Sequence, residues 1–492
     1  MIFEKNRKTD SFISLIALIK RIGLSQKKYD DVLAWGEVYG GLLYTNHTGV
    51  YRDDDFEKLL VDTYKTQISK PAPTEISVGE LHVITDPLST GGHTRLMERM
   101  IASRSCGDIL VTRPIRRLED RLWVNSKVHL WHNADQFNIS ELISIVSKYK
   151  IVYLHITPND LLASVAVAVA KKVNRARVIF VNHADHVFSF GFFAADVVAE
   201  VSAHGLLVSE RKRNVPSSFL GIPIDTSLLA EISQPTASSP EKRFEIVSAG
   251  SRLKYRPSRN HSFPKVAMLV LKEAPKARIV VIGPSVLLDW WWWAAMLRYP
   301  LRLRVLPPMS YQLYLDRITK ADLYIDSMPM TGGTTVPEIR SRGIPVTGLT
   351  SDSRGYSPLD ATRFPDIKEL ILAIQEYALS GAGPILEMNN NDETLRRTML
   401  VHGRTSFEQR LNNIVMGLSN APPPDVLSRE NINYYRDQWQ QCGVVNFNYK
   451  SVYFTLTYRK SPQVPVIPIR LRLLVVSAIP NLLVRYLLRL FN

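Results

Sequence analysis

The sequence has few of the features that mark disulfide-stapled, secreted or membrane-spanning proteins. Its 492 residues include only two cysteines, Cys106 and Cys442, which lie too far apart in sequence to form a metal or redox motif. A reducing compartment is therefore expected. Near the N-terminus a brief apolar stretch, residues 13–19, precedes two basic residues and no small-residue cleavage site. Secretion is therefore not expected.

Acidic residues are scarce relative to basic ones. Lysine and arginine number 61 against 46 aspartates and glutamates, a net charge of +15. This excess favours an anionic partner such as a phosphate, a nucleotide or an acidic membrane surface. Because the sequence has no zinc-finger spacing, no aromatic-rich recognition strand and no low-complexity basic tail, nucleic-acid binding is the weaker interpretation.

Short β-branched runs alternate with helical stretches along most of the chain, a pattern typical of βαβ units and parallel sheets. A stretch rich in Ser, Thr and Pro near residues 225–242 separates two such series. We therefore expect an α/β protein with two Rossmann-like domains around a central cleft, an N-terminal helical extension and a C-terminal amphipathic helix. The expected divisions are a helical extension, a first Rossmann-like domain, a second Rossmann-like domain and a tail, over residues 1–75, 76–228, 243–420 and 421–492.

One segment of the second series carries the strongest signal. Residues 326–346 read DSMPMTGGTTVPEIRSRGIPV, in which a strand runs into a Gly-Gly turn that opens a helix. Gly332 and Gly333 let the backbone approach a ligand, and the N–H groups of Thr334 and Thr335 are expected to be unpaired at the helix start. Such a helix start attracts a diphosphate through its free donors and its dipole.

Further side chains are candidates for the same diphosphate ligand. Glu338, one turn into the helix, can direct its carboxylate toward a ribose diol. Lys254 lies in the loop after the first strand of the second series, where an ammonium would neutralise charge on a leaving diphosphate. Arg252, in the same loop, is a further candidate for the donor phosphates.

The segment resembles the donor-binding signature of the O-linked N-acetylglucosamine transferases and the related bacterial protein N-glycosyltransferases. That signature has an Asp, a Pro, a Gly-X-Thr-Thr, an acidic residue and a Gly-X-Pro in this order, and the matching residues here are Asp326, Pro329, Gly332, Thr334, Thr335, Glu338, Gly343 and Pro345. Gly333 stands where the family has His, and Glu338 where it has Asp. The family's Lys-X-X-Pro is matched by Lys254 and Pro257.

The resemblance implies the GT-B fold and a glycosyltransferase activity. It implies that Thr334 and Thr335 bind the diphosphate and that Glu338 binds the ribose. The end of the segment is also similar to the Glu-X4-Gly-X-Pro-Val motif of the sucrose-synthase-like retaining enzymes, glycosyltransferase group 1. Those enzymes carry another Glu eight positions earlier, where this chain has Met330, so the stereochemical outcome stays open.

The first series supplies the predicted acceptor side. Gly91 and Gly92 form a turn that opens a helix and resembles the first loop of many GT-B N-terminal domains. His93 follows at the turn, where it is a candidate general base or phosphate ligand. Arg95 is a second candidate phosphate ligand.

A second polar cluster, NHADH, ends a predicted strand. His183 or His186 is expected to accept a proton, with Asp185 orienting the imidazole. No third metal ligand is evident beside them, although His155 ends the neighbouring strand, so no metal and no cofactor are expected. Histidines bonded only to backbone are the structural alternative.

Two aromatic and apolar stretches complete the analysis. The four tryptophans at residues 290–293 are expected to pack within a helix of the second domain. Residues 466–492 place leucines at helical spacing opposite arginines, and they are too short between charges to span a bilayer. We expect this tail to lie on an anionic membrane surface; docking back onto the protein is the alternative.

These observations predict a metal-independent glycosyltransferase. It would move a hexosyl or N-acetylhexosaminyl group from a nucleotide diphosphate sugar, UDP-linked, to a glycan or lipid-linked acceptor in polysaccharide biosynthesis. It would be cytoplasmic and peripheral on the inner face of a membrane. The alternatives are a non-catalytic nucleotide-sugar-binding protein and a protein glycosyltransferase.

Overall fold

The computed structural model describes most of the chain: residues 13–14, 16–67, 77–87, 92–105, 107–113, 128–129, 139–225, 243–257, 261–351 and 355–422, with residues 229, 232, 433, 436 and 437. Gly91, both cysteines and the tail helix expected at 466–492 lie outside these residues. Within them, no helix combines the length and the apolar character that crossing a membrane would require.

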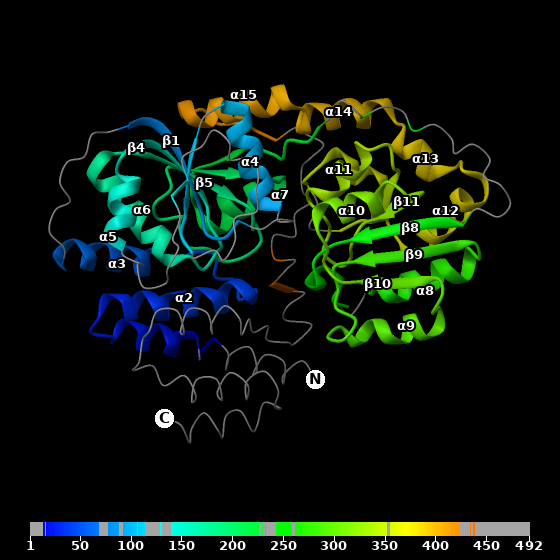
Figure 1. Ribbon diagram of the computed structural model, residues 1–492, viewed down its shortest axis with the longest axis horizontal. Helices are drawn as coiled ribbons and strands as arrows, with labels where there is room; N and C mark the ends of the chain where they lie inside the picture. Colours follow the sequence, from blue (N-terminus) through cyan, green and yellow to red (C-terminus); the bar gives the residue numbers. More distant parts are fainter. Residues whose placement is uncertain are drawn as a thin grey trace, which may run out of the picture.

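The first domain, at the left in Figure 1, is built on a parallel sheet. Its seven strands have the order β3-β2-β1-β4-β5-β6-β7. The strands are β1 (Ser77–Ile84), β2 (Asp108–Val111), β3 (Val128–His129), β4 (Tyr149–His155), β5 (Arg177–Asn182), β6 (Val197–Glu200) and β7 (Ser217–Phe219). The central strands are apolar and buried on both faces, because helices cover both sides of a parallel sheet.

Helices connect and cover these strands. They are α2 (Tyr29–Thr45), α3 (Asp54–Gln67), α4 (Gly92–Arg104), α5 (Ile139–Val146), α6 (Leu161–Asn174) and α7 (Ala203–Val208), which continues into a π-turn, η2 (Ser209–Arg213). In α6, the side chain of Asp160 caps the first turn by accepting from the N–H of Ala163 at 3.0 Å. The helix ends at Arg175 in the left-handed conformation.

The second domain has a parallel sheet of six strands in the order β10-β9-β8-β11-β12-β13. The strands are β8 (Phe244–Ala249), β9 (Ala277–Ile282), β10 (Leu303–Leu306), β11 (Leu323–Ile325), β12 (Val346–Leu349) and β13 (Arg363–Phe364). The helices are η3 (Arg252–Tyr255), α8 (Phe263–Glu273), η4 (Trp290–Trp292), α9 (Trp293–Arg298), α10 (Tyr311–Ile318), α11 (Thr335–Arg340), η5 (Pro358–Thr362), α12 (Ile367–Ser380), α13 (Pro384–Asn389), α14 (Asp392–His402) and α15 (Arg404–Met416).

In both sheets the order in which successive strands are added reverses at corresponding places. The reversal lies between β1 and β4 in the first sheet and between β8 and β11 in the second. In open parallel sheets, ligands bind beyond the carboxyl ends of the strands at this switch point. The loops that follow β1, β8 and β11 carry residues predicted from the sequence, and the loop after β5 carries the predicted His183, Asp185 and His186. The expectation of two Rossmann-like α/β domains is confirmed.

Helices that precede the first sheet and helices that follow the second sheet both pack on the first domain. Leu33, Trp35 and Phe56 of α2 and α3 are buried in the same core as α6 and the sheet. After the second sheet, α14 and α15 run from the second domain back to the first (Figure 1). Phe407 and Leu411 of α15 are buried in a cluster with side chains of α4 and β5. The two domains are thus tied together by more than the linker.

Candidate functional site

Asp326 fixes the loop that follows β11. Its buried carboxylate accepts hydrogen bonds from the N–H of Ser327 at 2.8 Å and from the N–H of Gly332 at 3.0 and 2.9 Å. Arg363 donates to the same carboxylate at 2.7 Å. A Cβ atom on Gly332 would lie 2.8 Å from Asp326 Oδ1, so only glycine fits this approach. Asp326 therefore holds the loop, and both of its carboxylate oxygens are bonded within the protein.

The start of α11 offers free backbone donors. Thr334, at the N-cap position, makes no side-chain capping hydrogen bond. In the part of the chain that the structure describes, no group accepts from the N–H of Gly333, Thr334 or Thr335. Three consecutive unpaired amides at a helix start are the donors that a phosphate oxygen requires.

Lys254 lies against the same loop. Its Nζ donates to the carbonyl oxygen of Thr331 at 2.9 Å, three residues before Thr334. The side chain is half-buried. Burial lowers the pKa of Lys254, while the carboxylates of Asp326 and Asp185 act in the opposite direction. The structure therefore brings together the lysine and the amides that the sequence assigned to one diphosphate pocket.

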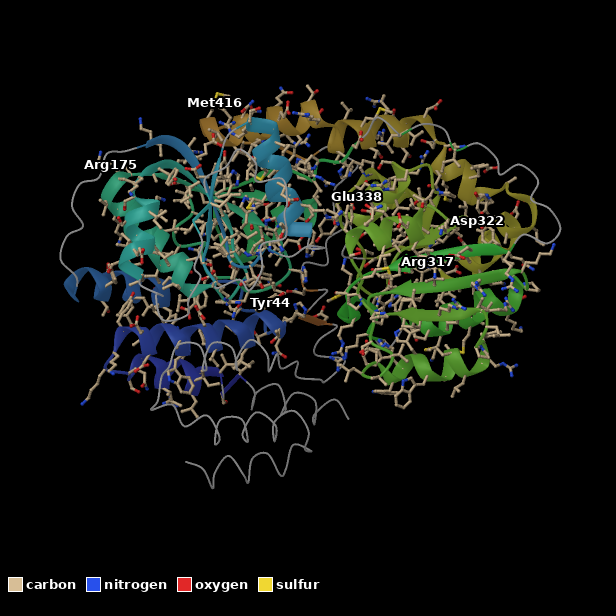
Figure 2. All side chains as sticks on the ribbon, viewed as in Figure 1. Tyr44, Arg175, Arg317, Asp322, Glu338 and Met416 are labelled. Atoms are coloured by element: carbon tan, nitrogen blue, oxygen red, sulfur yellow. The ribbon has the colours of Figure 1, made fainter. Side chains whose placement is uncertain are left out.

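The first domain faces this pocket through α4. A Cβ atom on Gly92 would lie 3.4 Å from Thr334 Oγ1, so the turn before α4 meets the turn before α11. Glu338 lies at the boundary between the domains (Figure 2). Its carboxylate accepts hydrogen bonds from Arg95 at 3.1 Å and from Arg99 at 2.7 Å. The residue expected to bind a ribose is thus paired with two arginines of the opposite domain.

The hydrogen bond of His93 defines its tautomer. His93 Nε2 lies 3.3 Å from the carbonyl oxygen of Asp86, and because a carbonyl only accepts, Nε2 carries the proton. Nδ1 is then the basic nitrogen of the ring. Burial lowers the pKa of His93, against the pull of Asp86, so the ring is neutral at pH 7.

Three further histidines continue inward from His93. The ring of His183 packs edge-on against His93 with centroids 5.5 Å apart. His155 Nδ1 lies 3.0 Å from His183 Nε2, and His155 Nε2 lies 3.0 Å from His82 Nδ1. Burial, with the neighbouring histidines, holds the pKa of His155 and of His183 well below the usual value. This row of neutral rings fixes the orientation of His183.

Asp185 and His186 form a separate group from the His93 row. His186 Nδ1 is 2.9 Å from Asp185 Oδ1, and the His186 ring lies 5.6 Å from that of His47. Tyr356, from the second domain, donates to Asp185 Oδ2 at 2.8 Å. Although burial alone would raise the pKa of Asp185, His186 and Ser202 hold it below its usual value. Asp185 is therefore an ionised acceptor that joins the domains.

Arg252 is directed elsewhere. Its guanidinium donates to the buried Asp289 at 2.6 and 3.0 Å, in the loop before the tryptophan run. Arg99, Tyr356 and Asp289 were missed from the sequence. Arg99 lies one helical turn after Arg95, and this spacing is the only feature of the sequence that indicates it. No local pattern indicates Tyr356 or Asp289.

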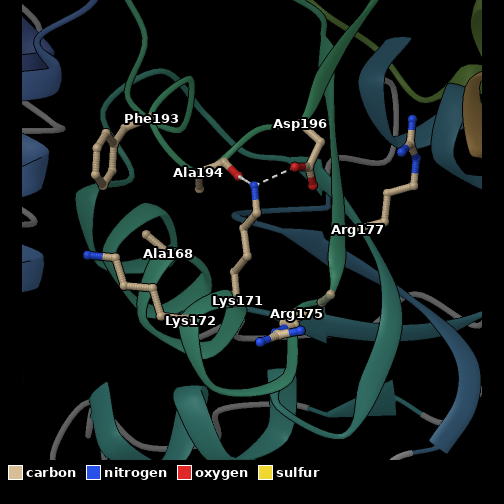
Figure 3. A pocket seen from close by; sticks show the side chains of 9 residues that line it. Ala168, Lys171, Lys172, Arg175, Arg177, Phe193, Ala194 and Asp196 are labelled. Atoms are coloured by element: carbon tan, nitrogen blue, oxygen red, sulfur yellow. Dashed lines mark hydrogen bonds and ion pairs between the residues drawn. The ribbon is translucent and has the colours of Figure 1, made fainter. Parts of the chain in front are cut away.

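Two hollows on the described surface contain none of these residues. One, of about 490 Å³, is lined by four basic side chains and by Phe193 and Asp196 at the end of α6 (Figure 3). There Lys171 donates to Asp196 at 2.7 Å and to the carbonyl oxygen of Ala194 at 2.9 Å. Basic residues at the carboxyl end of a helix stabilise its dipole, which explains this charge without a ligand. The other, of about 640 Å³, lies between α7 and residues 420–422.

Among the described residues, no three or more His, Cys, Asp or Glu side chains are arranged so that they could hold a metal ion. The chain matches no protein-family model. A search of curated proteins also finds no match.

Solved structures show the fold. The Anabaena protein HepE in complex with UDP and glucose has a TM-score of 0.51 and 12% identity, with 70% of this chain and 100% of HepE covered. HepE in complex with UDP-glucose gives 0.50 and 12%, over 69% and 100% of the two chains. The N-terminal domain of the Candida albicans trehalose-6-phosphate phosphatase gives 0.50 and 12%, over 71% and 99%. The protein has the GT-B fold.

Proposed function

We propose that the protein is a glycosyltransferase that uses a nucleotide diphosphate sugar, UDP-linked, as donor. The observation that carries the proposal is the position of Lys254 Nζ, 2.9 Å from the Thr331 carbonyl and beside the unpaired amides of Gly333 to Thr335. An ammonium and a row of N–H groups around one turn form a site for a diphosphate. HepE, which shares the fold, is seen with UDP and glucose bound, and this supports the choice of donor.

The first domain supplies the base in the proposed reaction, and the second domain supplies the groups that bind the leaving diphosphate. The acceptor hydroxyl gives its proton to His93 Nδ1 as its oxygen bonds to the anomeric carbon of the sugar. The bond from that carbon to the β-phosphate oxygen breaks, and the nucleoside diphosphate leaves with the electron pair. Lys254 and the amides at the start of α11 stabilise the charge that develops on the leaving group. Asp185 and the histidine row hold the acceptor-side groups in place.

The donor sugar is a hexose or an N-acetylhexosamine, and the acceptor is a glycan or a lipid-linked sugar in polysaccharide assembly. The net charge of +15 supports an anionic setting such as the inner face of a membrane. The peptide-acceptor alternative has less support, because the described residues before β1 form helices that pack in the core of the first domain, α2 and α3 among them, and they make no array of helical repeats.

A donor screen tests the proposal. The full chain is incubated with UDP-glucose, UDP-galactose, UDP-N-acetylglucosamine and their GDP counterparts, and release of the nucleoside diphosphate is followed with and without glycan and polyprenyl-phosphate acceptors. Acceptor-dependent release from at least one donor, absent in Lys254→Ala with an unchanged circular dichroism spectrum, is the expected result. Tight donor binding without any release would identify a non-catalytic binding protein.

A further inference from the structure

Six large apolar side chains stand out from one short segment of the second domain. They belong to the turn before η4, to η4 and α9, and to the turn that follows. We call them the α9 patch: Leu287, Leu288, Trp290, Trp293, Leu297 and Leu301, with exposed fractions of 85%, 64%, 67%, 49%, 81% and 78%. Scattered exposed apolar residues are ordinary, whereas a contiguous group marks an interaction surface.

The tryptophan run is divided between core and surface. Trp292 is fully buried and packs against Tyr255 and Phe263, with ring centroids 5.8 and 5.9 Å apart. Trp290 and Trp293 point outward. The expectation that the whole run packs inside the domain is therefore correct for Trp292 and wrong for Trp290. Because the Trp292 ring is buried, it holds the backbone in place, and the side chains of Trp290 and Trp293 are exposed.

A second contact holds the patch in place. Asp289 accepts from the N–H of Ser285 at 2.8 Å and from Arg252, and the indole N–H of Trp293 donates to the carbonyl oxygen of Val286 at 2.7 Å. The segment is thus an ordered surface. An ordered apolar surface loses little conformational entropy when a partner covers it.

The charge around the patch has one sign. Residues 263–308 include seven basic and two acidic residues, a net charge of +5. Of the two acids, Asp289 is buried and Glu273 is paired with Lys272 at 3.0 Å. Arg298, on α9, and Arg304, on the edge strand β10, are exposed beside the apolar side chains. A complementary partner therefore has a negatively charged surface with an apolar layer beneath it.

We propose that the α9 patch docks on an anionic lipid bilayer. Proteins that bind such a surface insert tryptophan and leucine side chains into the headgroup region and place arginines at the level of the headgroups. A second copy of the chain fits less well, because it would bring the same positive charges together. The docking itself depends neither on sugar transfer nor on the tail at 466–492, whereas its use in bringing an acceptor to the enzyme rests on the proposed function.

The patch also borders the proposed donor pocket. η3 carries Arg252, bonded to Asp289, and Tyr255, packed on Trp292; it also carries Lys254. Docking through α9 would hold this turn close to the membrane surface. A lipid-linked acceptor would then meet the enzyme without diffusing through water.

Vesicle flotation of the full chain tests the proposal. We compare vesicles of phosphatidylcholine alone with vesicles that contain roughly one third phosphatidylglycerol. The patch variant is Leu287→Ser/Trp290→Ser/Leu297→Ser. The control is Leu379→Ser/Met416→Ser/Leu418→Ser, three side chains that are also exposed, by 76%, 66% and 55%, but lie elsewhere. The fold of each variant is checked by thermal unfolding.

The wild type and the control are expected to float with the anionic vesicles, and the patch variant to lose roughly tenfold or more of this partitioning. Arg298→Glu/Arg304→Glu should weaken binding to anionic vesicles severalfold and reduce its dependence on salt. Brominated phospholipid should quench tryptophan fluorescence in the wild type more than in Trp290→Ser/Trp293→Ser. Equal flotation of wild type and patch variant would overturn the proposal. So would a wild-type dimer that the patch substitutions convert to a monomer while flotation stays the same.

Discussion

Arg99 of α4 and Glu338 of α11 form an ion pair of 2.7 Å that joins the two domains. The Glu338 side chain is only 9% exposed, so the pair is largely removed from water. A second arginine, Arg95, reaches the same carboxylate at 3.1 Å and lies over the ring of Tyr311 at 4.4 Å. If Glu338 binds a ribose, the ribose hydroxyls must either share the carboxylate with these arginines or displace them.

This competition predicts opposite effects of two substitutions on donor binding. Arg99→Met leaves Glu338 in place and frees its carboxylate, so the Kd for UDP should stay the same or fall. Glu338→Gln removes the charged acceptor and should raise the Kd about tenfold, the value of one hydrogen bond to a charged group. Calorimetric titration with UDP measures both. An equal loss of affinity in the two variants would mean that the ion pair itself, rather than a ribose contact, shapes the site.

His93 should control the rate and leave donor binding intact. His93→Gln removes the basic Nδ1, and kcat should fall by roughly 10² to 10⁴, the usual contribution of a general base. The Kd for UDP should change less than about twofold, because no donor phosphate contact depends on this nitrogen in the proposed mechanism. A variant with an unchanged kcat would remove His93 from the chemistry.

The pH profile gives an independent check on His93. Since burial lowers the pKa of His93 from its ordinary value of 6.5, the unprotonated base persists in mildly acidic solution. The acid limb of kcat/KM should therefore lie below pH 6.5 in the wild type and be absent from the residual activity of His93→Gln. A limb above pH 6.5 would be inconsistent with the burial of this ring.

His402 predicts acid sensitivity of the fold. Burial lowers its pKa to about 4, from 6.5, and its Nδ1 donates to the carbonyl oxygen of Ile222 at 2.6 Å. A group whose pKa is depressed in the folded state contributes stability that is present above pH 6.5 and lost as the pH falls toward 4. The slope is about 1.4 kcal/mol per pH unit for one such group.

His402→Asn keeps a donor near Ile222 and removes the titration. Its free energy of unfolding, from urea titrations at several pH values, should fall less steeply between pH 6.5 and 4 than that of the wild type. Other buried histidines, among them His82, leave part of the acid slope in place. An unchanged slope in His402→Asn would show that folding does not lower the pKa of this ring.

The fold could be predicted because its signals are local. The apolar run of β4 and the helix that follows it fix a βαβ unit, and the same pattern after residue 243 fixes the second. The turn at Gly332 was also readable, since Gly-Gly-Thr-Thr before a helix demands close backbone approach and leaves amides unpaired. These features depend on neighbours within a few residues in the chain.

The partners of the site residues could not be predicted, because they are set by the docking of two domains. Glu338 meets Arg99 across 239 positions of the chain, and Asp185 meets Tyr356 across 171. The ion pair of Arg252 could not be predicted either, because its partner, Asp289, lies 37 residues away in the chain and is buried within the same domain. No spacing rule encodes contacts of this kind.

The most direct test of the account is the affinity of Lys254→Ala for UDP and for uridine. Arg252→Ala is the matched control, because it removes one positive charge from the same turn, where the guanidinium is held by Asp289. If Lys254 and the amides at Thr334 hold a diphosphate, Lys254→Ala should weaken UDP at least about tenfold and leave uridine unchanged. Arg252→Ala should leave both nearly unchanged. Equal affinity of wild type and Lys254→Ala for UDP would contradict the proposed diphosphate site.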